Sequence, residues 1–390
     1  MSRMPQLTRP KILENLEKRW REKIVYTLIG DIVTSVNPFC RPIDSEGPEL
    51  TRKYLADNVK LNTPSELPPH IYTLVAKALL RMQQNDCSQS ILISGESGAG
   101  KTEATKLVIA HLGDIVRKAA ASGKAAASRV GIAERVKESS PIMEPIGNAR
   151  TVRNDNSSRF GKHIDVQFDT GGRSIIGART NVYLLEKPRV CEHDKGERNY
   201  HIFYMLMTGA PEEVRRSCRL QGTWESYSIM KRADGTTQAV VQTWDDAAEW
   251  ANMLEALDKL GLQQDESMKL FRLVACVLHV GNLSIVEDAA GATSAARVQN
   301  LEQLQIAAEL MQIAPADKLA RAICYQTKYF PGEKEPIATE LNEKKAKVAR
   351  DSLCRHLYQL TFDWCVERVN KALAGPSVSV AHCVGILDIF

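Results

Sequence analysis

Hydrophobic and polar positions follow two different periods in the first third of the chain. Residues 68–82 and residues 101–117 each place apolar side chains at helical spacing. The segment between them, residues 88–94, is a short apolar run rich in isoleucine, which is typical of a strand buried on both faces of a sheet. A strand, a glycine-rich loop and a helix therefore follow one another, and this order predicts an α/β architecture.

The middle of the chain shows alternation first and helical spacing afterwards. Residues 164–182 alternate apolar and polar positions around two glycines, as a β-hairpin does. From about residue 190 onward helical patterns dominate. Thr243 and Asp246 resemble a capping box for a helix that ends near Gly261, and a second helix is expected over residues 265–280.

Towards its end the chain predicts one long helix and one further strand. The apolar face of the helix is expected to carry Leu353, Leu357, Leu360 and Trp364, and Gly375 closes it. Residues 383–390 read as a second buried strand that contains an acid, Asp388. Residues 118–129 and 287–297 are small and polar, which favours surface loops.

Composition narrows the function classes without choosing among them. The chain has 390 residues, 44% hydrophobic and 25% charged, and a net charge of +4, so disorder is disfavoured and bulk charge gives no argument for a nucleic-acid partner. Nine scattered cysteines without a CxxC pair favour free thiols in a reducing compartment. No apolar run reaches the roughly 18 residues of a membrane span, and no secretory signal is visible at the N-terminus.

The glycine-rich loop carries the clearest chemistry. Residues 95–102, GESGAGKT, fit the pattern GxxxxGK[ST] between a predicted strand and a predicted helix. The glycines let successive backbone N–H groups face a polyphosphate, Lys101 can reach the β and γ phosphates, and Thr102 can offer its hydroxyl to Mg²⁺. The alternative is a glycine turn with a solvated lysine, which the complete pattern disfavours. A phosphate-binding loop (P-loop) alone does not say what nucleotide hydrolysis drives.

A second motif points to a family. Residues 154–162, NDNSSRFGK, resemble switch I of myosin motor domains, and GESGAGKTE resembles the myosin form of the P-loop. The segments YLLEKPRVCEHDKGERNYHIFYML, LVACVLHVGNL, ARDSLCRHLYQLTFDWCVERVN and GILDIF follow in the myosin order. The resemblance covers essentially the whole chain and is specific.

The resemblance implies a fold and a domain organisation. The expected fold is that of an α/β P-loop NTPase, with a mostly parallel sheet flanked by helices and a largely helical upper subdomain. The nucleotide-binding region is expected over residues 1–204, the upper subdomain over 205–375, and the start of switch II over 383–390. The chain then corresponds to about the first half of a myosin head and stops within switch II, at Phe390.

The resemblance also implies roles for individual residues. The nucleotide-binding residues of the P-loop are Gly95, Glu96, Ser97, Gly98, Ala99, Gly100, Lys101, Thr102 and Glu103. Asn154 and Ser157 resemble the switch I residues that hold phosphate oxygens and the attacking water, and Arg159 is the switch I arginine. The Mg²⁺ ligands are Thr102, Ser158 and, through a water, Asp388. The glutamate that pairs with Arg159 in the family would lie beyond Phe390, so Arg159 is expected to lack its partner.

Two further segments are interpreted with less support. Asn37, Pro38 and Phe39 resemble the adenine-side segment of the family, although NPF is also a common turn. Residues 329–353 resemble the upper actin-contacting surface loop, in which Glu335 occupies a position that is acidic or phosphorylatable in the family. The alternative for Glu335 is an ordinary exposed acid.

The function implied by the resemblance is an actin-based cytoskeletal motor that binds and hydrolyses MgATP in the cytoplasm. Actin filaments are the expected partner, and light chains bind the full-length proteins at sites that this chain does not contain. Neither nucleic acid nor a membrane span is expected. Two alternatives stay open: a catalytically inert remnant that binds nucleotide or another protein, and a P-loop NTPase unrelated to actin.

Overall fold

The chain folds into two compact units. The computed structural model describes residues 8–40, 47–57, 59–61, 65–121, 131–232, 240–288, 295–328, 337–375 and 380–388. Unit 1 comprises Met1–Ser140, Gly161–Tyr183 and Val369–Phe390, and unit 2 comprises Pro141–Phe160 and Leu184–Arg368. The division near residue 204, expected from the family, stays a prediction.

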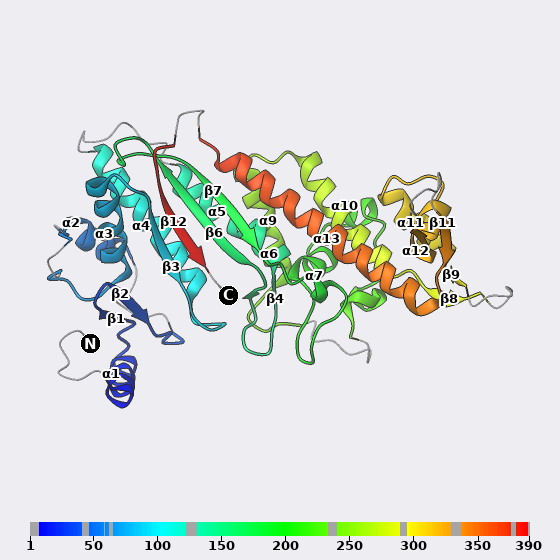
Figure 1. Cartoon of the computed structure of the whole chain (residues 1–390), viewed down its shortest axis with the longest axis horizontal. Helices are drawn as coiled ribbons and strands as arrows, with labels where there is room; N and C mark the ends of the chain where they lie inside the picture. Colours follow the sequence, from blue (N-terminus) through cyan, green and yellow to red (C-terminus); the bar gives the residue numbers. More distant parts are fainter. Residues whose placement is uncertain are drawn as a thin grey trace. The chain divides into compact units, whose positions relative to one another are not determined.

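Unit 1 combines a sheet with helices from the first third of the chain (Figure 1). Its helices are α1 (Arg9–Arg21), α2 (Pro48–Ala56), α3 (Ile71–Asn85), α4 (Lys101–Ala121) and α5 (Gly131–Glu138). Its strands are β1 (Tyr26–Ile29), β2 (Ile32–Ser35), β3 (Gln89–Ile93), β6 (Gly161–Phe168), β7 (Ile175–Tyr183) and β12 (His382–Asp388). The helices α3 and α4 and the hairpin β6–β7 confirm the corresponding sequence predictions.

The largest sheet in the described part of the chain has four strands in the order β3-β12-β6-β7. The strand β12 is parallel to β3 but antiparallel to β6, and β6 is antiparallel to β7. The prediction of a mostly parallel sheet is therefore wrong for these residues. The reason is the β6–β7 hairpin, which joins the sheet as a unit and contributes two of its three pairings in antiparallel form.

The buried side chains of this sheet lie on one face. Ile91, Ile164 and Ile386 are 5% exposed or less, and α3 and α4 contact β3 and β12. Leu92, the next residue along β3, points to the opposite face and is 64% exposed. The prediction that β3 is buried on both faces is wrong for this reason, because an apolar run alone does not show which faces are covered.

The end of α13 covers the outer edge of β7. Asn370 accepts a hydrogen bond from the Thr180 N–H (2.7 Å) and donates one to the Thr180 carbonyl oxygen (2.8 Å). A single amide side chain thus satisfies both backbone groups that a further strand would have paired.

Unit 2 is mostly helical. Its short N-terminal elements are α6 (Ser140–Gly147), whose first residue belongs to unit 1, β4 (Asn148–Ala149), β5 (Ser157–Ser158) and η1 (Lys187–Val190). The helices and 3₁₀ turns that follow are α7 (His201–Thr208), α8 (Glu212–Ser217), η2 (Trp224–Ser226), η3 (Ser228–Met230), α9 (Asp246–Lys259), α10 (Gln264–Gly281), α11 (Leu301–Leu310) and α12 (Asp317–Cys324).

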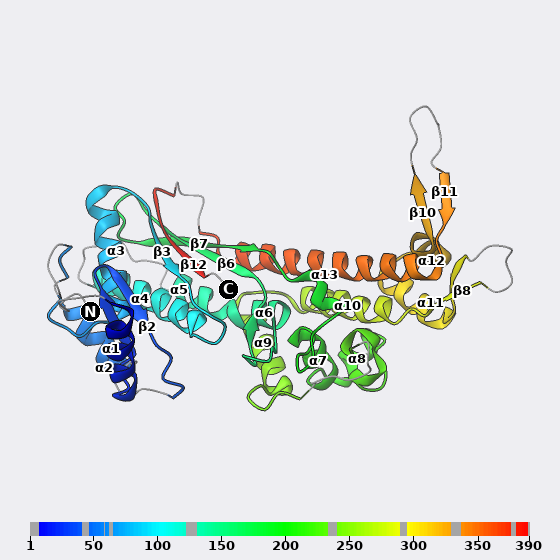
Figure 2. The same ribbon diagram turned by 60° about the horizontal axis from the view of Figure 1, so that its bottom comes forward.

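Unit 2 also holds two hairpins and most of the longest helix. The strands β8 (Ile285–Glu287) and β9 (Ala296–Val298) pair antiparallel, as do β10 (Tyr325–Lys328) and β11 (Ile337–Glu340). Figure 2 shows β10 and β11 as a two-stranded ribbon that extends away from α12. The helix α13 (Glu343–Leu373) belongs to unit 2 as far as Arg368.

Two predicted loops differ from the structure. The ends of the expected loop 287–297 lie in β8 and β9, because Val286 and Arg297 pair across a hairpin. Residues 118–121 of the expected loop 118–129 continue α4, since alanine and lysine are good helix formers, and its remaining residues lie outside the described part.

Two predicted details of helices are also wrong. Asp245, not Thr243, caps α9, because its carboxylate accepts hydrogen bonds from the N–H groups of Ala247 and Ala248. The buried face of α13 carries Cys354, Tyr358, Phe362 and Cys365, whereas Leu360 is 51% exposed. Spacing by three and four residues fits two neighbouring stripes of this helix, and cysteine, tyrosine and phenylalanine occupy the buried one.

Candidate functional site

The P-loop connects β3 directly to α4. The strand ends at Ile93 and the helix begins at Lys101, so the loop occupies the position that the motif requires. Gly98 and Gly100 have φ angles of +81° and +94°, a left-handed backbone that residues with a side chain rarely adopt. The glycines are therefore needed for the path of the loop itself.

The backbone of the P-loop accepts hydrogen bonds from the loop's own lysine, Lys101, in this conformation. The Lys101 Nζ donates hydrogen bonds to the carbonyl oxygens of Gly95 (2.8 Å) and Glu96 (3.0 Å). The Ala99 N–H donates to the Glu96 carbonyl oxygen (3.1 Å). Both acceptors are neutral carbonyls of the loop, so an anionic phosphate is a stronger partner for both donors.

Asp388 lies at the same edge of the sheet as the P-loop. In the strand register Asp388 is opposite Ile93, the last residue of β3, and on its other side it is opposite Lys162. Because β3 and β12 are parallel, their carboxyl ends meet at one edge, where α/β proteins bind their ligands. The expected metal-linked acid is thus next to the start of the phosphate loop.

The predicted adenine-side segment contacts the P-loop. The Asn37 Nδ2 donates to the Gly98 carbonyl oxygen (2.8 Å), and its Oδ1 accepts from the Phe39 N–H (2.9 Å). Phe39 is 83% exposed. Sequence reasoning placed Asn37 near the nucleotide but gave no signal for this contact across 61 positions.

The switch I residues form a compact turn in unit 2. Ser157 and Ser158 pair with Ala149 and Asn148 in the β4–β5 ladder. The Asn154 Oδ1 accepts from the Asn156 N–H (3.1 Å), and the Ser158 hydroxyl donates to the Phe160 carbonyl oxygen (2.8 Å). The structure thus places Asn154, Ser157 and Ser158 together in one segment, which continues into β6 at Gly161.

Arg159 has a partner within unit 2. Its Nε donates to the Glu186 Oε2 (2.7 Å), and the Arg189 Nε donates to the same oxygen (2.6 Å). The glutamate expected as its partner from the family would lie beyond Phe390, and the structure shows a different carboxylate, Glu186, in contact with Arg159. The Glu186 N–H also donates to the Arg159 carbonyl oxygen (3.0 Å), so Glu186 holds Arg159 through both its side chain and its backbone.

The ion cluster around Glu186 is partly buried. The Arg189 side chain is 4% exposed and also pairs with Glu197 (2.6 Å). Burial acts to raise the pKa of Glu186, but the hydrogen bonds and charges of Arg159 and Arg189 outweigh it and hold that pKa below its usual value. Glu186 is thus ionised at neutral pH.

A second contact fixes the middle of switch I. Asp155 accepts from the Arg150 Nε (3.0 Å) and from the Thr243 hydroxyl (2.6 Å). Thr243, expected to cap α9, therefore holds switch I instead. Sequence reasoning missed both Glu186 and Thr243 because their partners are 27 and 88 positions away.

Comparison with known proteins decides the family. The family model described as Myosin head (motor domain) matches residues 1–390. The chain belongs to the myosin head family. It is 37% identical over 394 residues to Myosin IB heavy chain of Dictyostelium discoideum, with 99% of this chain and 33% of that protein covered.

Other relatives give the same result. The chain is 36% identical to Unconventional myosin-Ia of Mus musculus, with 98% of the chain and 35% of that protein covered. It is 35% identical to Myosin-14 of Arabidopsis thaliana, with 100% of the chain and 24% of that protein covered. The chain thus spans about a third of the length of the first curated myosins that it matches.

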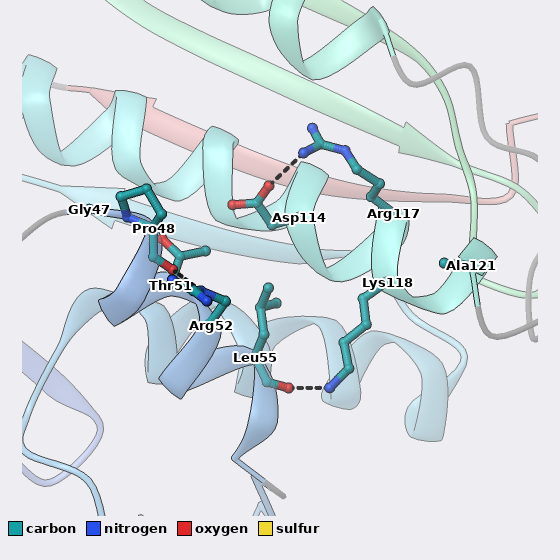
Figure 3. A pocket seen from close by; sticks show the side chains of 9 residues that line it. All are labelled: Gly47, Pro48, Thr51, Arg52, Leu55, Asp114, Arg117, Lys118 and Ala121. Atoms are coloured by element: carbon teal, nitrogen blue, oxygen red, sulfur yellow. Dashed lines mark hydrogen bonds and ion pairs between the residues drawn. The ribbon is translucent and has the colours of Figure 1, made fainter.

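A pocket elsewhere in unit 1 is distinct from the P-loop. It has a volume of about 640 Å³ and lies between α2 and the C-terminal half of α4 (Figure 3). Its cations already have partners: Arg117 pairs with Asp114 (3.1 Å) and the Lys118 Nζ donates to the Leu55 carbonyl oxygen. In this myosin head the motif, not the cavity, marks the candidate site.

The remaining sequence expectations concern absent features. All nine cysteines are described and are free thiols. Among the described residues, no group of three or more His, Cys, Asp or Glu side chains is arranged to hold a metal ion. None of the described helices combines the length and apolar character needed to cross a membrane.

Proposed function

We propose that this myosin head chain binds MgATP at residues 95–102 and is part of an actin-based motor that hydrolyses it. The observation that carries this proposal is the register of β12 with β3. It aligns Asp388 with Ile93, the last residue before the segment that leads into the P-loop, so an acid and a phosphate-binding loop lie at one edge of the sheet. Family membership supports the same reading.

The phosphates are held by the loop. Lys101 exchanges its two carbonyl partners for phosphate oxygens, and the backbone N–H groups of residues 95–100 and the first turn of α4 donate to the same anion. Glu103, which pairs with Lys106 (3.0 Å) in the first turn of α4, belongs to the motif but adds no positive charge.

The proposed metal ligands have the chemistry of a magnesium site. The hydroxyl of Thr102 and the carboxylate of Asp388 are oxygen donors, the type that Mg²⁺ prefers, and Asp388 acts through a water. The resemblance adds the Ser158 hydroxyl, whose proton is donated to the Phe160 carbonyl, so its lone pairs remain for a metal. Bound Mg²⁺ supplies charge neutralisation to the phosphates.

Switch I supplies positioning without a covalent nucleophile. We assign Asn154 and Ser157 to phosphate oxygens and the attacking water, and we keep Arg159 as the switch I arginine, a catalytic residue that acts through an ion pair with a carboxylate. Phosphoryl transfer demands mainly such positioning and charge stabilisation. Asn37 and Pro38 are assigned to the nucleotide base side, next to the exposed ring of Phe39.

Actin is the proposed partner of the longer protein. The strand β10 precedes residues 329–353, the segment that resembles the upper actin-contacting loop, and β11 and the start of α13 lie within it. Glu335 itself lies outside the described residues. Light chains belong to the full-length protein. We place the protein at the cytoskeleton in the cytoplasm and keep residues 1–204 and 205–375 as its nucleotide-binding region and upper subdomain.

Single-turnover hydrolysis on the purified chain tests the proposal. Limiting ATP is mixed with excess protein with and without Mg²⁺, and phosphate is measured with time. Hydrolysis above buffer that requires Mg²⁺ supports the enzyme. Binding of ATP without hydrolysis supports the alternative of a nucleotide-binding remnant, and co-sedimentation with actin filaments that does not respond to ATP contradicts the motor assignment.

A further inference from the structure

The N-terminal helix is connected to the P-loop by two consecutive hydrogen bonds. The Trp20 Nε1, in the last turn of α1, donates to the Asn37 carbonyl oxygen (3.1 Å). The Asn37 Nδ2 in turn donates to the Gly98 carbonyl oxygen (2.8 Å). Asn37 therefore contacts α1 through its backbone carbonyl and the P-loop through its side-chain amide.

The second bond acts on the peptide group that the phosphate needs. The Gly98 carbonyl and the Ala99 N–H belong to the same planar peptide unit and point in opposite directions. Asn37 donates a hydrogen bond to the oxygen of this peptide unit. The N–H of the same unit, that of Ala99, donates to the Glu96 carbonyl oxygen (3.1 Å). Turning the Ala99 N–H towards an anion must rotate the whole unit and move the oxygen that Asn37 holds.

The outer end of this connection is anchored. Next to Trp20, the Arg19 Nε donates to the Thr27 hydroxyl (2.7 Å) and its Nη2 donates to the Tyr26 carbonyl oxygen (2.6 Å), which fixes the last turn of α1 to β1. The Lys23 ammonium lies 5.2 Å from the centre of the indole ring. A small displacement of Asn37 thus changes the hydrogen bond of the Trp20 indole, while the last turn of α1 stays attached to β1.

We propose that Trp20 and Asn37 form a relay that couples α1 to the P-loop, so that a phosphate anion bound by the loop is sensed at α1. Asn37 is a positioning residue, since it acts on the loop through Gly98. The relay rests on the proposed function, because it assigns to the nucleotide-binding loop a means of communicating with the N-terminal helix.

Two neutral variants separate the links of the relay. Trp20→Phe keeps an aromatic ring but removes the N–H donor, and Asn37→Ala removes the contact with Gly98 without adding charge near the phosphates. Asn282→Ala is the matched control. Asn282 bridges backbone groups in the same way, accepting from the Ser228 N–H (2.7 Å) and donating to the Ser226 carbonyl oxygen (2.8 Å), but it lies in unit 2.

The first readout needs no nucleotide. Amide hydrogen exchange of residues 95–100 is measured for the unsubstituted chain and the three variants. Loss of one neutral hydrogen bond is expected to speed exchange about two- to fivefold in Asn37→Ala, and less in Trp20→Phe. The control leaves these amides unchanged. Equal exchange in Asn37→Ala and the unsubstituted chain overturns the relay.

The second readout is the tryptophan emission on adding MgADP, with binding followed separately by equilibrium dialysis. The unsubstituted chain and Asn282→Ala are expected to change emission, while Trp20→Phe binds MgADP with a smaller change. An undiminished change in Trp20→Phe overturns the relay. If dialysis finds no MgADP bound to the unsubstituted chain, the proposed function fails, and the exchange comparison still decides whether the relay exists.

Discussion

Two cations of the proposed site are held in opposite ways. Lys101 in unit 1 donates only to neutral carbonyl oxygens of its own loop. Arg159 in unit 2 is bound to an ionised carboxylate that it shares with a nearly buried arginine, Arg189. The two cations of the proposed site therefore begin from different resting states.

The different partners of Lys101 and Arg159 indicate different roles, binding of the phosphates by the P-loop and rearrangement of switch I. An anion can capture Lys101 by replacing weak partners, so the P-loop is prepared for immediate binding. Any rearrangement of switch I that moves Arg159 has to break its ion pair with Glu186, a carboxylate that Arg189 also holds. We infer that the free energy of the ion cluster around Glu186 sets how readily switch I rearranges. The free energy of the Lys101 contacts in the P-loop sets the affinity for the phosphate anion.

The largest effect is expected at Lys101. Lys101→Ala removes the side-chain cation of the P-loop and should weaken binding of a fluorescent ATP analogue about a hundredfold, because hydrogen bonds to a charged group are lost. Lys106→Ala is the matched control, since Lys106 lies one turn further along α4 and pairs with Glu103 (3.0 Å). Equal affinities of the two variants would contradict the assignment of the P-loop.

A smaller effect is expected at Glu186. Glu186→Gln leaves Arg159 and Arg189 without their shared anion and should lower the free energy of unfolding by about 1–2 kcal/mol, a value reduced from that of a fully buried pair because Glu186 is partly exposed. Urea unfolding measures it. Glu134→Gln breaks the exposed pair with Arg117 and should cost less than about 0.5 kcal/mol.

Substitutions at Thr243 and at the nearby Asp245 are expected to act on different segments. Thr243→Val removes a hydrogen bond to Asp155 and should speed amide exchange over residues 154–156 while α9 is unaffected. Asp245→Ala removes the cap of α9 and should destabilise that helix by about 1 kcal/mol without loosening switch I. Faster exchange in α9 after Thr243→Val would contradict this assignment and would support Thr243 as the cap of α9, as the sequence suggested.

The smallest effect concerns pH. Burial, and next the charge of His70, lower the pKa of His111 in α4 to about 4, so His111 is neutral in the folded chain. The unfolded chain binds a proton below about pH 6.5, so stability falls as pH decreases towards 4, by about 0.7 kcal/mol between pH 7 and pH 6. His111→Gln should reduce this slope in thermal melts, and the part that remains comes from other buried histidines such as His193, whose pKa burial also lowers to about 4. Glu186, whose pKa is lowered, contributes nothing in that range.

The sequence predicted what depends on local order. The P-loop lies between β3 and α4 as expected because glycines at 98 and 100 are the residues that tolerate the left-handed backbone there. The β6–β7 hairpin and α10 were likewise visible in alternation and helical spacing. These features need no knowledge of distant partners.

The sequence could not predict what depends on distant contacts. Whether β12 pairs with β3, β6 or both is a choice between segments hundreds of positions apart, so the mixed sheet was read as mostly parallel. The exposure of Leu92 depends on which face the helices cover, and nothing near Arg159 in the sequence indicates Glu186 as its partner. In each of these wrong predictions the helix or strand was expected correctly, and the error concerned which other segment it contacts.

The most direct test of the central claim is the map of amide protection when MgADP binds to the unsubstituted chain. Hydrogen exchange followed by mass spectrometry compares every peptide with and without nucleotide. The account predicts the strongest protection in peptides that cover residues 95–103, with smaller protection at the carboxyl end of β12. Protection confined to other segments, with residues 95–103 unchanged, would contradict the assignment of this loop as the nucleotide site.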